Sequence, residues 1–120
     1  MKAAKNSVKV TKAEMTVGSP ATTINLVAHK GGSLTLSITE WHSSASIELD
    51  RMEIAALVNS LVSAVYEQED RTVTDSDSGF LSVSNVDWKV KLDMFSAGHD
   101  ASATLTRDEA LTLVDHIHSF

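Results

Sequence analysis

Apolar and polar residues alternate along most of the chain with the period of two that predicts β-strands. The alternation is strongest over residues 34–38, where leucine and isoleucine are separated by hydroxyl residues, and over residues 86–94, where Trp88 falls on the apolar side. Gly31-Gly32 precedes the first of these stretches and favours the positive φ angles of a tight hairpin turn. The predicted strands cover residues 8–17, 24–28, 33–41, 44–49, 80–83, 86–95 and 101–105.

Two segments change from this alternation to the 3.6-residue period of an amphipathic helix. Each begins with a capping-box pattern, Asp50 with Glu53 in the first and Thr106 with Glu109 in the second. The apolar stripes that follow are Ile54, Leu57, Val58, Leu61, Val62 and Val65, and then Ala110, Leu113, Val114 and Ile117. Each stripe predicts a helix with one face packed on the strands.

The two helical segments belong to an internal repeat. Residues 45–61 align with residues 101–117 at an offset of 56 without a gap, and seven of the seventeen pairs are identical. A period this long, present twice, indicates two similar half-domains that share one core rather than an open array.

These patterns predict an α+β fold made of two tandem βββα repeats with an extra N-terminal strand. We expect an antiparallel sheet with both helices packed on one face and a pseudo-two-fold relation between the units. A chain of 120 residues is long enough to form one domain with its own core. The predicted parts of this domain, residues 1–120, are a basic arm and strand (1–20), the first βββα unit (21–66), an acidic linker (67–79) and the second βββα unit (80–120).

Charge is distributed unevenly around the net value of −6. Residues 1–12 contain four lysines and no acidic residue, so residues 13–120 carry −10. An acidic body repels nucleic-acid phosphates, which lowers the expectation of a nucleic-acid partner. The chain contains no cysteine and no apolar run of about 20 residues, so we expect a cytoplasmic protein that does not interact with a membrane.

Candidate catalytic and metal-binding groups do not form a recognised motif. His116 and His118 are too close in sequence to chelate one ion from a helix, and polar turns explain His42 and His99 as well as a shared site would. Residues 75–79 resemble the start of a calcium loop but lack its closing glutamate. We therefore expect no enzyme activity, no metal and no cofactor.

The sheet face that the helices leave uncovered is the expected binding surface. Strand alternation places Trp41, Phe95, Lys89 and Lys91 on this face. Aromatic rings there can stack on bases or anchor a protein contact, and lysines can contact phosphates. The alternative is that Trp41 and Phe95 pack at strand ends against a loop or a second copy of the chain.

Residues 46–53 and 103–109 give the chain a family resemblance. A strand that leads directly into a capped helix, present twice, resembles the PUR-repeat, Whirly and positive-coactivator group of proteins. The resemblance implies paired strand-rich units that bind single-stranded nucleic acid on the sheet. Proteins of that group generally have four strands per unit, whereas the pattern here predicts three per unit and one extra.

The sequence as a whole favours a small non-catalytic protein-interaction module, of the kind found among regulators, inhibitors and virus-type accessory factors. We expect it to bind a protein partner, or a second copy of itself, through the uncovered sheet face. The alternative function is binding of single-stranded nucleic acid, as the resemblance implies.

Overall fold

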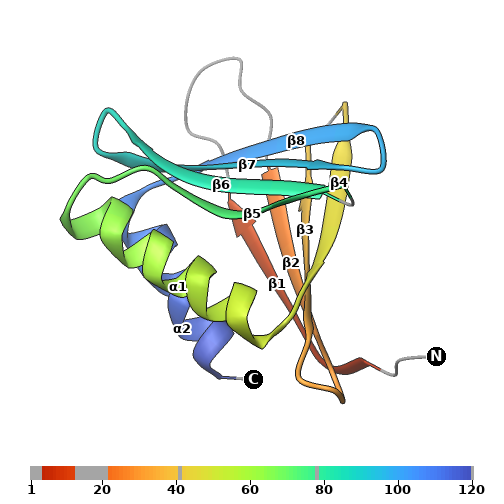
Figure 1. The fold of residues 1–120 in the computed structure, drawn as a ribbon. Helices are drawn as coiled ribbons and strands as arrows, with labels where there is room; N and C mark the ends of the chain where they lie inside the picture. The colour runs from red at the N-terminus through yellow and green to blue at the C-terminus, as the bar shows by residue number, and fades with distance from the viewer. Residues whose placement is uncertain (1–3, 13–21, 41, 78, 120) are drawn as a thin grey trace.

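The strands form two four-stranded antiparallel sheets in the computed structural model, which describes residues 4–12, 22–40, 42–77 and 79–119. Neighbouring strands in each sheet follow each other in the chain. Sheet A contains β1 (Ala4–Lys12), β2 (Thr22–His29), β3 (Leu34–Thr39) and β4 (Ser44–Leu49), and α1 (Arg51–Tyr66) follows it. Sheet B contains β5 (Arg71–Ser76), β6 (Gly79–Val86), β7 (Lys89–Ser96) and β8 (His99–Leu105), and α2 (Arg107–His118) follows it (Figure 1).

The predicted α+β class is confirmed, as are the antiparallel strands and the helix that ends each unit. The extra N-terminal strand is β1, which pairs with β2. The part of the predicted first strand beyond Lys12 lies outside the described residues. Each unit therefore consists of a four-stranded meander and a helix.

The acidic segment 67–79 is not only a linker, because it contains β5 and the first residue of β6. β5 pairs with β6 through a register shift between Thr72 and Thr74. It is one of the two edge strands of sheet B, and most of its side chains are exposed. An edge strand with little burial needs no apolar alternation, and charged residues on it prevent pairing with other chains. The prediction missed β5 for this reason.

Both helices begin with the capping box that the sequence predicts. The backbone N–H of Glu53 donates to Asp50 Oδ1 at 2.8 Å, and the N–H of Asp50 donates to Glu53 Oε1 at 3.0 Å. Thr106 and Glu109 exchange the same two hydrogen bonds at the start of α2. These bonds satisfy backbone donors that the first turn of a helix leaves free, so each helix starts directly after its strand.

The two sheets lie at a steep angle to each other, and the two helices fill the space between them (Figure 1). α1 follows sheet A in the chain but contacts β5, β6 and β7 of sheet B. α2 contacts α1, β1, β7 and β8. The inward residues of both sheets and both helices form one continuous apolar core. Each helix thus ties the two units together.

Sheet A packs closely on sheet B at Gly79, where an added Cβ would lie 2.9 Å from Ile47 Cδ1 and 3.2 Å from the backbone oxygen of Phe95. A residue with a Cβ fits there only if the Ile47 side chain or the neighbouring backbone shifts. Gly79, which in the sequence resembles part of a calcium loop, is therefore explained by packing.

We predict that Leu57→Ala and Leu113→Ala each lower the free energy of unfolding by about 2–5 kcal/mol, because both side chains are fully buried at equivalent positions of the two helices. Chemical denaturation measures this loss. Met52→Ala is the control, since Met52 is 83% exposed on α1 and should cost less than about 0.5 kcal/mol. Equal effects of the three substitutions would contradict the assignment of the core.

We predict that Gly79→Ala lowers the free energy of unfolding by about 1–3 kcal/mol, because the new methyl group overlaps Ile47. Ile47→Val removes the contacting Cδ1 atom, so the cost of Gly79→Ala should fall in that background. Gly31→Ala is the matched control, since an added Cβ at Gly31 meets nothing within 4 Å. A double-mutant cycle without coupling would show that the sheets do not meet here.

Candidate functional site

Three of the four predicted site residues lie on β7 and belong to the outer face of sheet B. Val90, Leu92 and Met94 are buried, so the alternate residues of the strand point away from the core. Phe95 is 46% exposed on this face, as predicted. Trp41 lies outside the described residues.

These three residues do not form one cluster. Lys89 and Phe95 stand six positions apart on one strand, which corresponds to about 20 Å. Lys91 Nζ lies 3.7 Å from Asp93 Oδ1, and both side chains are about two-fifths exposed. Asp93 thus lies between the lysines and Phe95, and the aromatic end of the strand is separated from its basic end.

The environment of Phe95 consists of an aromatic and two acidic residues. In the register of sheet B, Phe95 pairs with Phe80 on β6 and with Asp100 on β8, and Phe80 pairs with Asp75 on β5. Side chains of directly paired residues lie on the same face with Cβ atoms about 5 Å apart. A row of carboxylate, phenyl, phenyl and carboxylate therefore crosses all four strands. Alternation with Leu81 in the sequence is enough to predict that Phe80 points outward. It does not predict that Phe80 lies opposite Phe95, because that depends on the register of the two strands.

A hollow of about 360 Å³ opens at this row, where the β3–β4 connection of the first unit meets β7 and β8. Its lining consists of Glu40, His42, Ser43, Phe80, Asp93, Met94, Phe95, Asp100, Ala101 and Ser102. The two units therefore contribute to it together. The sequence pairs His42 by symmetry with His99. His42 lines this hollow, and His99 is not among its lining residues.

Two hydrogen bonds hold the β3–β4 connection against β8. Ser43 Oγ donates to the backbone oxygen of Asp100 at 2.6 Å, and the backbone N–H of Ser102 donates to Glu40 Oε2 at 3.2 Å. β8 is an edge strand, and a carboxylate that accepts its N–H protects that edge from pairing with another chain. The wall of the hollow is thus fixed by polar contacts between the units.

The outer face of sheet A is a weaker candidate because its polar groups bond to one another. Ser37 Oγ lies 2.7 Å from Ser46 Oγ, and His29 Nε2 lies 2.8 Å from Thr35 Oγ1. None of the large exposed apolar side chains that the structure describes lies on sheet A. They belong to Met52, Tyr66, Val86, Trp88 and Phe95.

Trp88 does not lie on the apolar side of a strand, which corrects the sequence prediction. The chain turns at Asp87 and Trp88, whose φ angles are 52° and 68°, and Trp88 is 76% exposed at the tip of the β6–β7 hairpin. Two-residue hairpins require positive φ at both central positions, where glycine and asparagine are favoured. A tryptophan in this conformation is strained, and the sequence signal for the turn is missing.

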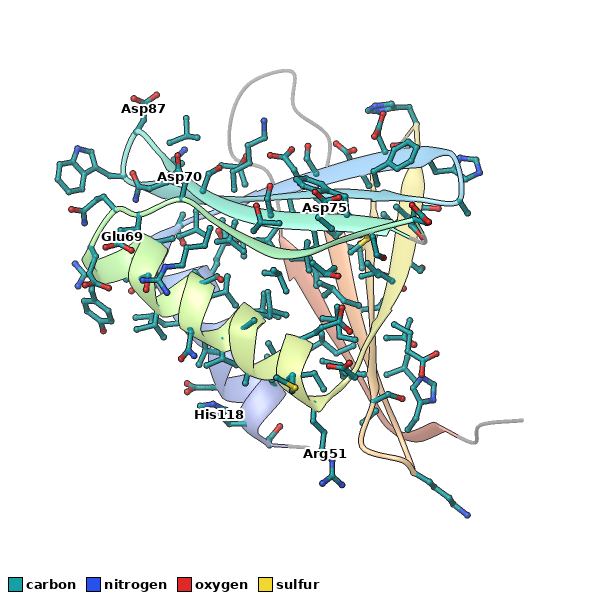
Figure 2. All side chains as sticks on the ribbon, in the orientation of Figure 1. Arg51, Glu69, Asp70, Asp75, Asp87 and His118 are labelled. Atoms are coloured by element: carbon teal, nitrogen blue, oxygen red, sulfur yellow. The ribbon has the colours of Figure 1, made fainter. Side chains whose placement is uncertain are left out.

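Acidic residues gather at the same end of the molecule, where Figure 2 shows Asp87, Asp70 and Glu69, while Arg51 and His118 lie at the opposite end. Asp70 Oδ1 accepts the backbone N–H of Asn85 at 2.9 Å, which fixes the end of β6 beside β5. Glu69 accepts two hydrogen bonds from the Arg71 guanidinium, and this carboxylate raises the pKa of Arg71. The Asp70–Asn85 contact holds β6 close to its turn, and the turn residue Trp88 stays exposed.

No described group of three histidine, aspartate or glutamate residues is placed to hold a metal ion. Neither helix in the described part of the chain is long and apolar enough to cross a membrane. Comparisons with models of protein families, with curated proteins and with solved structures find no match to this chain.

We predict that Trp88→Gly raises the free energy of unfolding by about 1 kcal/mol, because glycine adopts a positive φ without strain and the ring makes little contact with the core. Thermal or chemical denaturation measures the gain. Lys89→Gly, one residue later in β7, should instead be destabilising by about 0.5–1 kcal/mol. A loss of stability from both changes would mean that the indole packs on the protein.

Proposed function

We propose that this chain is a small non-catalytic protein-binding module that acts through the outer face of sheet B, with Phe95 as its anchor. The observation that carries the proposal is the paired phenyl rings of Phe80 and Phe95 on a sheet face that the helices do not cover. Exposed aromatic residues beside a hollow are typical of protein-interaction surfaces.

The charges around the rings favour a protein over a nucleic acid. Asp93 and Asp100 lie beside Phe95, and Glu40 lines the same hollow. A base stacked on Phe95 would bring its phosphates close to these carboxylates, which is unfavourable. The lysines that would contact phosphates lie toward the other end of β7.

The exposed Trp88 at the far end of the β6–β7 hairpin supports an extended contact along this strand pair. Its strained backbone is not offset by burial of the ring within the chain. Strain of this kind concentrates at functional sites. The proposed surface therefore extends along the β6–β7 hairpin from Phe95 to Trp88.

We predict that Phe95→Ser leaves the fold intact and weakens partner binding by about 2 kcal/mol or more, roughly thirtyfold, because an aromatic anchor is lost. Partner capture from cells of the source organism, with affinity measured on the purified complex, tests this. Sedimentation velocity over a range of concentrations tests whether the partner is a second copy. Met52→Ser removes an even more exposed apolar side chain, from the helical layer, and should not change binding. Equal binding by both variants would contradict the proposal.

Single-stranded nucleic-acid binding is the second candidate function. The observation that favours it is the count of four strands and one helix in each unit, which matches the units of the PUR-repeat, Whirly and positive-coactivator group. A titration with a labelled thymidine oligonucleotide at two salt concentrations separates the candidates. Affinity that falls steeply with salt would support nucleic-acid binding, and no binding at low salt would exclude it for this probe.

A further inference from the structure

We propose that the hollow beside Phe95 binds an arginine side chain of the protein partner, an inference that rests on the proposed function. The hollow combines two phenyl rings with three carboxylates, and none of the described residues that line it is a lysine or an arginine. A guanidinium group is the protein side chain that stacks on an aromatic ring and also forms paired hydrogen bonds with carboxylates.

The cross-strand row sets the position for the guanidinium. Phe95 lies between Phe80 and Asp100, and Asp93 precedes it by two residues on the same face. A cation over the ring of Phe95 is thus within reach of carboxylates on β7 and β8. The ring and the carboxylates both attract a positive charge. These attractions are stronger in a partly desolvated hollow than at a fully hydrated surface.

Among the described residues, one of the three carboxylates, Asp93, forms an ion pair with a lysine. Lys91 is the basic partner of Asp93, but their charged atoms are 3.7 Å apart and both side chains are about two-fifths exposed, so this ion pair is weak. Glu40 Oε2 accepts hydrogen bonds from the N–H of Ser102 and from Ser43 Oγ, and Glu40 Oε1 accepts none from the described residues. The hollow therefore retains acceptors for an incoming guanidinium.

The shape and charge of the wider molecule fit such a partner. A volume of about 360 Å³ accommodates a guanidinium and part of its methylene stem. Residues 13–120 carry a net charge of −10, which attracts a basic segment from a distance. The hollow would provide the specific contact after this encounter.

The test is an amide chemical-shift titration of the full chain with the peptide acetyl-Gly-Gly-Arg-Gly-Gly-amide. Two further peptides carry citrulline, which has nearly the same shape without the charge, or lysine in place of arginine. We expect saturable shifts centred on Phe95, Asp100 and Ser102. The citrulline peptide should bind at least about tenfold more weakly, and the lysine peptide should fall between the two.

Matched variants separate a specific site from general attraction. Asp93→Asn with Asp100→Asn should weaken arginine binding by about tenfold, whereas Asp108→Asn with Asp115→Asn, which makes the same change of net charge on α2, should leave it within about twofold. Phe95→Leu keeps an apolar side chain and should still weaken binding, because it removes the ring. The amide spectrum of each variant reports its folding.

Absence of saturable shifts, equal loss in both double variants, or equal binding of the citrulline peptide would overturn the inference. A thymidine oligonucleotide that shifts the same residues more strongly would also overturn it and would support the nucleic-acid function. If the arginine peptide fails while Phe95→Ser still abolishes partner capture, the proposed function stands and this inference falls. If Phe95→Ser has no effect on capture, the proposed function itself is wrong.

Discussion

The apolar contact between the inward faces of two sheets is the constraint on which the rest of this structure depends. α1 leaves sheet A and packs mainly on sheet B, and α2 contacts β1 of sheet A as well as β7 and β8 of its own sheet. The two units therefore share one core, and Ile47 of sheet A packs closely against Gly79 of sheet B. The largest fully buried side chains come from both units and both helices. Loss of the contact between the units would therefore expose apolar residues of both sheets.

This arrangement also determines where a binding surface can lie. The helices cover the inward faces, so each sheet keeps one outer face. On sheet A the described polar side chains pair locally, as Ser37 does with Ser46. On sheet B, the exposed Phe95 and the half-buried Phe80 lie between carboxylates, and the β3–β4 connection of the other unit completes the hollow. The surface thus depends on the packing of the two units.

Periodicity in the sequence predicts the class, the repeat and both helix starts, because buried faces and capping boxes require particular residues at fixed spacing. It correctly predicts that Phe95 points outward, since Met94 is buried. It misses β5 because an exposed edge strand needs no apolar pattern, and it misplaces Trp88 because a strained turn lacks its usual residues. The pairing of Phe95 with Phe80 and the approach of Glu40 to Ser102 depend on register and packing between distant segments, which no local pattern encodes.

The central claim is that Phe95 on the outer face of sheet B meets a protein partner. Site-specific incorporation of a photo-crosslinking phenylalanine derivative at position 95, with position 52 of α1 as the control site, tests this claim most directly in cells of the source organism. We expect a discrete protein adduct at position 95 and none at position 52, since both sites are exposed but only one lies on the proposed surface. A nucleic-acid adduct at position 95, or a protein adduct at position 52 alone, would contradict it.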